Sequence, residues 1–206
     1  MNVDFWNKMA HSYDKNAERV YSSANKKTID TSVKFCKENM DILDIGCGTG
    51  LFTLPMAKHV KHFKAIDYSQ KMLNIAKLKS NAENISNIEW CCEDLSDVKF
   101  DKTYDMITAF NVLVYLPHIE ECLRNIYEHL DDSGYFLSVT DCLGEKNILF
   151  NFASTVLEKL GIKPKMHNFK INTLRKLIED AGFEIVLGDS LYNSPPNYFI
   201  AARKKQ

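Results

Sequence analysis

The sequence has no excess of charge of either sign, and it has few arginines. Its 26 basic and 27 acidic residues give a formal net charge of −1, and only four of the basic residues are arginine. A protein dedicated to nucleic acid normally carries a clustered basic excess, and arginine supplies the forked contact to phosphate. These absences argue against nucleic acid as the main partner.

Long hydrophobic runs and paired cysteines are also absent. No stretch approaches the roughly 18 uninterrupted apolar residues of a membrane span, and the first residues lack the basic head and apolar run of a signal peptide. The six cysteines are scattered and form no C-x-x-C pair, so neither a metal site nor a disulfide framework is expected. We therefore expect a cytoplasmic protein with reduced thiols and no membrane contact.

What the sequence does contain is an alternation of strand-length and helix-length segments. Its 206 residues, 45% of them hydrophobic, suit one globular domain. Five short apolar runs predict strands that are covered on both faces: 41–45, 62–66, 88–92, 104–110 and 134–140. Helical spacing of apolar residues predicts helices between several of them: 70–76 (capped by Ser69), 119–130 (ended by 131–134), 149–160 and 174–181.

The last part of the chain departs from this rhythm. Runs 183–187 and 198–202 predict two further strands, joined by a polar loop that contains two prolines and no helix. A pair joined without a helix should be antiparallel. The whole pattern predicts an open α/β sheet with right-handed crossovers.

A glycine-rich segment, Asp44-Ile45-Gly46-Cys47-Gly48-Thr49-Gly50, follows the first predicted strand. Glycines at these positions let the backbone turn tightly and approach a ligand closely. The dinucleotide fingerprint G-x-G-x-x-G would need glycine at position 51, which is Leu51. The early third glycine and the aspartate at the strand end favour a cationic, amino-bearing ligand over a pyrophosphate.

Carboxylates end the next two predicted strands. Asp67 comes 21 residues after Gly46, where an acid in this kind of fold can accept hydrogen bonds from both ribose hydroxyls. The segment 93–95 (Glu-Asp-Leu) ends the third strand, where a carboxylate can reach the amino group of an adenine. Ligands of open α/β sheets bind at the carboxyl ends of the strands, so the glycine loop and these acids predict one shared site.

These motifs resemble those of the class I S-adenosylmethionine-dependent methyltransferases. The resemblance rests on segments 42–50, 66–69, 93–95 and 104–107, which occur in the family's order over roughly residues 40–140. It implies a Rossmann-like, doubly wound sheet of seven strands, mostly parallel with an antiparallel last strand, and helices on both faces. It also implies S-adenosyl-L-methionine as the cofactor and in-line methyl transfer to a small-molecule acceptor.

The resemblance further implies which residues bind the cofactor: Asp44, Gly46, Cys47, Gly48, Gly50, Asp67, Tyr68, Asp94, Leu95, Phe110 and Asn111. The glycine loop would hold the methionine part. Asp67 would bind the ribose, Asp94 the adenine amino group, and Leu95 would pack on the ring. Phe110 and Asn111 would border the methyl group.

The same resemblance divides the single domain into four parts: an N-terminal helical lid (1–38), a cofactor-binding core (40–140), an acceptor-side insert (142–170), and a helix with a terminal β-hairpin (171–206). The insert contains Phe150, Phe152, Met166, His167 and Phe169, which favours a small, partly apolar acceptor, although the 149–160 stripe could equally belong to the core.

An enzyme that promotes methyl transfer by aligning the acceptor with the methyl group needs a base only when the acceptor arrives protonated. The lid segment 5–14 resembles the W-x-x-x-A-x-x-Y-D stretch of small-molecule methyltransferases, which implies that Tyr13 lines the pocket. The alternative is that Trp6 and Tyr13 only fix the helix to the sheet. Tyr13 and His11 are the candidate catalytic residues, His11 as a base. Many relatives have a histidine where Val114 stands; Tyr115 or His118 could replace it, although 117–118 are more typical of the start of the next helix.

Two other hypotheses stay open. Methylation of tRNA or of a protein side chain is one, and the near-neutral charge counts against it. The other is a cofactor-binding partner protein without catalysis, which the detection of a methylated product would exclude.

Overall fold

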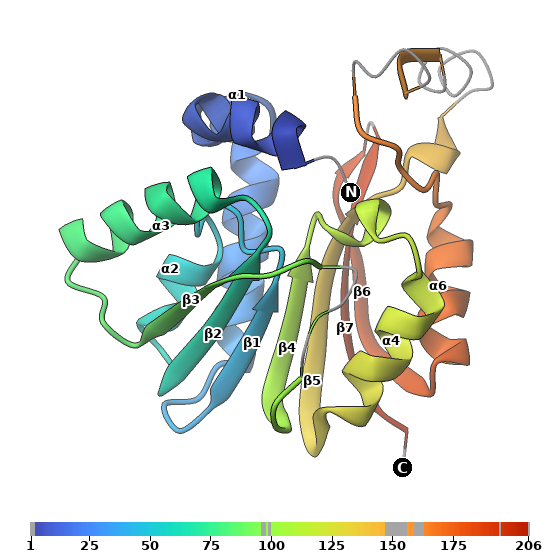
Figure 1. Cartoon of the computed structure of the whole chain (residues 1–206). Coiled ribbons are helices and arrows are strands. Elements are labelled where there is room, and N and C mark those ends of the chain that lie inside the picture. The colour runs from blue at the N-terminus through green and yellow to red at the C-terminus, as the bar shows by residue number, and fades with distance from the viewer. Residues whose placement is uncertain are drawn as a thin grey trace.

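Seven strands form one sheet in the order β3-β2-β1-β4-β5-β7-β6, as the computed structural model shows (Figure 1). The structure describes residues 3–95, 98, 100–146, 156–158, 163–193 and 195–205. The strands are β1 Asp41–Ile45, β2 His62–Asp67, β3 Ile88–Cys92, β4 Tyr104–Phe110, β5 Leu130–Asp141, β6 Phe183–Asn193 and β7 Pro196–Lys204. The helices are α1 Val3–Ser32, α2 Thr53–Ala57, α3 Gln70–Ala82, α4 Ile119–Glu128 and α6 Ile171–Asp180.

The strand directions match the fold that the resemblance implied. Strands β1 to β5 pair in parallel, and β7 runs antiparallel to both β5 and β6. The Rossmann-like, doubly wound sheet is therefore confirmed. Because β1 to β5 are parallel, their carboxyl ends meet at one edge, which brings the glycine loop, Asp67 and Phe110 together.

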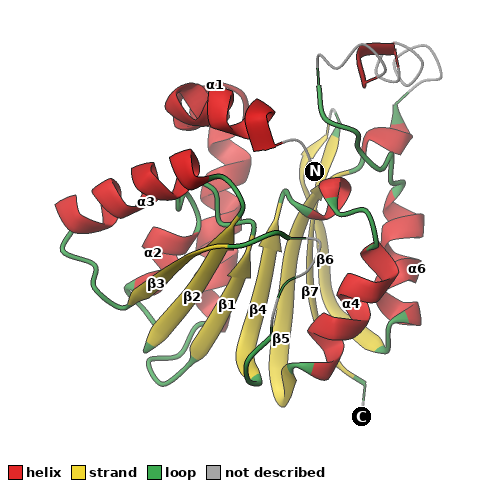
Figure 2. Ribbon diagram, viewed as in Figure 1, coloured by secondary structure: helices red, strands yellow, loops and turns green. Residues whose placement is uncertain are grey.

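Helices cover both faces of the sheet (Figure 2). Neighbouring residues of a strand point to opposite faces. In β1, Ile42 packs in a cluster with Met56 of α2, whereas Leu43 packs in a cluster with Leu123 of α4 and Ile178 of α6. Near-continuous burial along β1, β2 and β4 follows from this double cover and explains their unbroken apolar runs.

Local signals explain several helix ends. The Ser69 hydroxyl accepts a hydrogen bond from the Met72 backbone N–H at 3.2 Å, so the predicted cap of α3 is confirmed. The expected end of α4 is wrong. The helix stops at Glu128. Residues 131–134 belong to β5, because Leu130 already pairs with Tyr104 of β4 and the ladder continues after a bulge.

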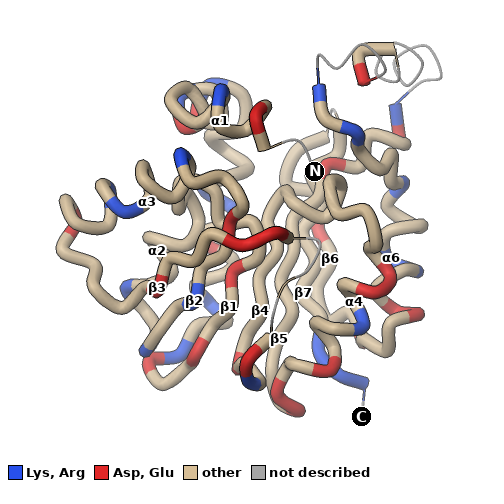
Figure 3. Tube along the Cα trace, viewed as in Figure 1, with Lys and Arg blue, Asp and Glu red and all other residues tan. Residues whose placement is uncertain are grey.

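The loop expected between the last two strands is also wrong. The antiparallel ladder continues until Asn193 pairs with Pro196, so most of that segment is strand. The predicted 149–160 stripe, with Phe150 and Phe152, lies outside the described residues except for 156–158. No helix within the described ranges combines the length and apolar character needed to cross a membrane. Basic and acidic residues are interspersed over the helices in the view of Figure 3.

Candidate functional site

The glycine loop after β1 adopts a conformation that requires glycine. Gly46 and Gly48 have φ angles of +75° and +55°, a region that side chains other than glycine rarely adopt. A Cβ atom on Gly46 would lie 2.5 Å from Val112, whereas a Cβ on Gly48 would meet open space. Gly46 therefore allows close packing of the loop, and Gly48 leaves its peptide accessible from the adjacent cavity.

Asp67, at the end of β2, is locked against this loop. Its carboxylate accepts hydrogen bonds from the backbone N–H groups of Gly48 at 2.9 Å and Ser69 at 2.8 Å. Burial raises the pKa of Asp67, while these backbone bonds act in the opposite direction. The Tyr68 backbone N–H is a third donor to this carboxylate, so about one of its four acceptor positions remains for a ligand hydroxyl.

Asp44 lies beneath the loop. Its carboxylate accepts hydrogen bonds from the hydroxyls of Thr53 at 2.6 Å and Thr108 at 2.7 Å. Burial raises its pKa to about 6, although both hydroxyls favour the ionised form. Asp44 thus ties β1, β4 and the start of α2 together under the glycine loop.

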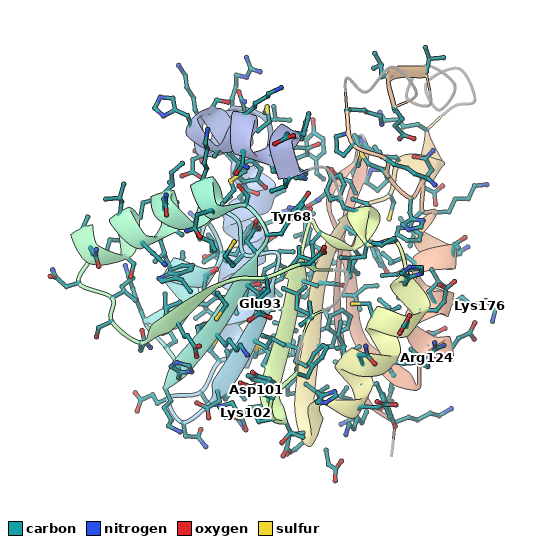
Figure 4. All side chains as sticks on the ribbon, in the orientation of Figure 1. Tyr68, Glu93, Asp101, Lys102, Arg124 and Lys176 are labelled. Carbon is teal, nitrogen blue, oxygen red and sulfur yellow. The ribbon has the colours of Figure 1, made fainter. Side chains whose placement is uncertain are left out.

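A cavity of about 440 Å³ opens beside the loop and Asp67. Tyr68, which helps to line it, lies at the carboxyl edge of the sheet below α1, and Asp101 and Lys102 lie toward the opposite edge (Figure 4). The cavity brings together eight of the residues predicted from the sequence: Tyr13, Gly46, Gly48, Asp67, Tyr68, Leu95, Phe110 and Asn111. Four further residues complete its described lining: Trp6, Met72, Val112 and Tyr115.

Five predicted residues are not among the described residues that line this cavity: His11, Asp44, Cys47, Gly50 and Asp94. Cys47 is buried against Ala65 and Leu73. Gly50, at the start of the helical turn, packs near Trp90 and Leu54. His11 and Asp94 have exposed side chains.

A larger cavity of about 1060 Å³ adjoins the first and shares four lining residues with it: Trp6, Tyr13, Asn111 and Tyr115. Apolar side chains of α1 form much of its wall, and Met166 of the insert contributes to it. His167 instead lines a third cavity, where its Nε2–H donates a hydrogen bond to the Leu116 carbonyl oxygen at 2.8 Å and its ring stacks on Phe169.

Residues 3–20 of α1 belong to the predicted lid, and several of them line the first two cavities. This part of α1 lies above the carboxyl ends of the central strands in the view of Figure 1. Asn7 accepts a hydrogen bond from the Ser69 hydroxyl at 2.7 Å, and Asp14 pairs with Lys79 of α3 at 2.9 Å. Tyr21 interrupts the helix with φ −125° and ψ 18°, so the lid meets the rest of α1 at a kink.

Two aromatic residues of the lid face the site. Trp6 packs edge-on against Tyr115 with ring centroids 5.0 Å apart. Tyr13 lines both cavities, and burial raises its pKa to about 12. Tyr13 is therefore a protonated hydrogen-bond donor at neutral pH.

A polar cluster in the larger cavity was not predicted from the sequence. The Asn197 amide donates to Asp141 at 2.8 Å and to Asn111 at 3.0 Å, and the Tyr21 hydroxyl donates to Asp141. Asp141 ends β5, so the strand-end rule that identified Asp67 could have found it. Tyr21 and Asn197 gave no such signal, because the kink of α1 and the register of β7 bring them here.

Comparisons with known proteins agree with this geometry. The sequence profile of a family described as a methyltransferase domain matches residues 42–134. A malonyl-[acyl-carrier protein] O-methyltransferase of Bacillus cereus is 29% identical over 143 residues, which are 66% of this chain and 50% of that protein. The chain thus spans about half the length of this curated relative.

Two solved structures share the fold. A methyltransferase described as putative, in complex with the Haloferax volcanii Trm112 methyltransferase activator, superposes with a TM-score of 0.80 at 16% identity, covering 98% of both chains. The magnesium protoporphyrin IX methyltransferase of Synechocystis, solved with bound SAH, gives a TM-score of 0.71 at 18% identity over 96% of both chains.

Proposed function

The chain belongs to the class I S-adenosylmethionine-dependent methyltransferases, and we propose that it transfers a methyl group from S-adenosylmethionine to a small-molecule acceptor by in-line displacement. One observation carries this proposal. Two adjoining cavities share Trp6, Tyr13, Asn111 and Tyr115; the glycine loop and Asp67 line one of them, and the lid lines the other. A methyl donor in the first and an acceptor in the second would meet at the shared wall.

The first cavity suits the cofactor in chemistry, because the glycine loop, a buried carboxylate and apolar side chains line it together. In this proposal the peptides of Gly46 and Gly48 hold the methionine end, Asp67 accepts from the ribose hydroxyls, and Leu95 packs on the adenine. Tyr68 lies beside the ribose, and Phe110 and Asn111 border the methyl group.

The remaining predicted residues would act less directly. Asp44 supports the glycine loop from beneath through its hydrogen bonds. Cys47 and Gly50 belong to the loop and fix its shape by packing against the neighbouring side chains, which supports the backbone that faces the ligand. Asp94 stays the proposed partner of the adenine amino group, next in sequence to Leu95. When bound, S-adenosylmethionine supplies a methyl group on a positively charged sulfur, so the chain itself needs no nucleophile.

The protein residues would align the acceptor and exclude water. Tyr13 can donate a hydrogen bond at the shared wall, whereas its raised pKa argues against a role as base. The exposed position of His11 gives the base role no support, and that role stays a prediction. The apolar wall of the larger cavity favours a small, partly apolar acceptor. The Bacillus and Synechocystis proteins are named for malonyl-[acyl-carrier protein] and magnesium protoporphyrin IX.

The test is release of S-adenosylhomocysteine from S-adenosylmethionine by the purified chain. Acceptors are supplied as separate pools of amines, phenols, thiols and carboxylates, beside tRNA and protein extracts. Turnover in a small-molecule pool is expected. Turnover only with the macromolecular pools would contradict the acceptor class, and failure to bind S-adenosylhomocysteine in calorimetry would contradict the cofactor assignment.

A further inference from the structure

We infer that the larger cavity takes an aromatic hydroxyl compound and that Asp141 accepts the proton which this hydroxyl loses during methyl transfer. The inference rests on the proposed function and deepens it, because it names the acceptor class and assigns a catalytic residue. Asp141 stands at the carboxyl end of β5 and lines the larger cavity.

The carboxylate of Asp141 is held in place by uncharged groups. Asn197 is 4% exposed, and its amide nitrogen donates one hydrogen to Asp141 at 2.8 Å and the other to Asn111 at 3.0 Å. Tyr21 donates a second hydrogen bond to the carboxylate. Asn111 also lines the cofactor cavity, so a single amide side chain separates Asp141 from the residue that borders the proposed methyl position.

The charges around the larger cavity leave Asp141 available as a base. The titratable groups that interact with it are Tyr13 and Tyr21 of α1, Tyr115 and the neighbouring Cys142. Lys163 lines the same cavity and is paired with Glu158 at 3.1 Å. Burial raises the pKa of Asp141, whereas the donors Asn197 and Tyr21 favour its ionised form.

This arrangement selects among acceptor chemistries. A hydroxyl is a poor nucleophile until its proton leaves, so it needs a base. A carboxylate acceptor is already ionised and would be repelled by the like charge of Asp141. A neutral amine can attack before it loses a proton. Five aromatic side chains in the wall favour an aromatic ring on the acceptor: Phe5, Trp6, Tyr13, Tyr21 and Tyr115.

The proposed step balances without a further reactant. The hydroxyl oxygen forms a bond to the methyl carbon as the carbon–sulfur bond breaks, and that electron pair returns to sulfur. The hydroxyl proton passes to the carboxylate of Asp141 and then to solvent. The products are a methyl ether, a neutral thioether and one proton.

The test compares Asp141→Asn with Asp132→Asn. Asp132 lies on the same strand, and its side chain is 99% exposed, so it serves as the matched control. Both variants should bind S-adenosylhomocysteine within about twofold of the unmodified chain, because neither residue is among the described lining of the cofactor cavity. With phenol as acceptor, Asp141→Asn should lower kcat by about 10²–10⁴-fold, the usual contribution of a general base, and Asp132→Asn should not change it.

A more acidic acceptor distinguishes two possible roles of Asp141, a catalytic base and a residue that only maintains the structure. The loss in Asp141→Asn should be smaller with 4-nitrophenol, and it should shrink as pH rises and this phenol ionises by itself. A second readout needs no turnover. Bound 4-nitrophenol should show the absorbance of its ionised form at lower pH in Asp141→Asn, because the like charge of Asp141 is gone.

Tyr21→Phe is a more conservative variant, because it keeps Asp141 and removes only one hydrogen bond to it. Its missing hydroxyl removes a hydrogen bond that lowers the pKa of Asp141, so the acidic limb of the pH–rate profile should move to higher pH. Equal losses with both phenols and no recovery at high pH would overturn the role of Asp141. Turnover of amines or carboxylates but of neither phenol would overturn the acceptor class and leave the proposed function intact. Absence of cofactor binding and of turnover in every pool would refute the proposed function itself, and this inference with it.

Discussion

The carboxylate of Asp67 accepts a hydrogen bond from the backbone N–H of Gly48 at 2.9 Å. This bond joins the end of β2 to the glycine loop after β1, so two segments 19 residues apart act as one unit. The second carboxylate oxygen accepts from the Ser69 N–H at 2.8 Å, directly before α3. One buried side chain thus fixes the loop and the helix start that border the proposed cofactor site.

Asp67→Ala should weaken binding of S-adenosylhomocysteine by roughly 1.5–3 kcal/mol, about 10- to 150-fold, because charged hydrogen bonds of that worth are lost. Titration calorimetry measures the change. Asp132→Ala, at an exposed site on β5, is the control and should bind normally. Unchanged affinity in Asp67→Ala would refute the assignment of Asp67 to the ribose.

Gly46→Ala should destabilise the fold more than Gly48→Ala. Both positions have positive φ, which costs a side-chain-bearing residue about 1–2 kcal/mol. Only at Gly46 would the new Cβ also collide with Val112, at 2.5 Å. Chemical denaturation of both variants tests the difference, and adding Val112→Ala to Gly46→Ala should recover part of the loss. Equal destabilisation of the two single variants would contradict the packing role of Gly46.

The sequence predicted the parts of the molecule that depend on local signals. The strands 41–45, 88–92 and 104–110 have the predicted bounds, because double burial leaves an unbroken apolar run that turn residues end. The sequence also predicted that the glycine loop and Asp67 lie side by side, because strand ends in a parallel sheet share one edge.

Features that depend on tertiary pairing were not predicted. The extra length of β5 and β6 comes from ladders with distant partners, such as Leu130 with Tyr104. The contact of Tyr21 with Asp141 needs both the kink of α1 and the end of β5. Asn197 reaches the site through the register of β7 against β5, in which it pairs with Asp141.

Asp44 should make the stability of the protein depend on pH. Its pKa is raised from 3.8 to about 6 in the folded chain, so between these values the folded state binds a proton that the unfolded state has lost. Stability from this group therefore falls as pH rises from about 4 to 6. Asp44→Asn removes this titration. The unfolding free energy of the variant, relative to that of the unmodified chain, should therefore rise by roughly 3 kcal/mol between pH 4 and pH 6.

Urea denaturation at pH 4, 5, 6 and 7 measures this gain. Asp67 also lies buried at the site, and its charge raises the pKa of Asp44, so the titration of Asp67 contributes to the measured difference. A constant difference in unfolding free energy between Asp44→Asn and the unmodified chain at all four pH values would show that Asp44 titrates alike in both states.

The pair of Asp14 and Lys79 should hold the lid closed over the two cavities. Their charged atoms lie 2.9 Å apart, and the side chains are 39% and 30% exposed, so solvent screens the interaction. Such partly exposed pairs contribute about 0.2–1 kcal/mol. Asp14→Ala and Lys79→Ala should each weaken S-adenosylhomocysteine binding only a few-fold, mainly through faster dissociation when the lid opens more often.

A double-mutant cycle separates the pair from the other contacts of each residue, since Asp14 also accepts a hydrogen bond from Thr49. The combined variant should lose less affinity than the two single losses added together, and the shortfall is the coupling through the lid. Lys58→Ala, which removes an exposed pair with Glu83 away from the lid, is the control. Additive losses in the cycle would mean that the Asp14–Lys79 pair does not hold the lid, and that the hydrogen bond between Asn7 and Ser69 is the contact to test next.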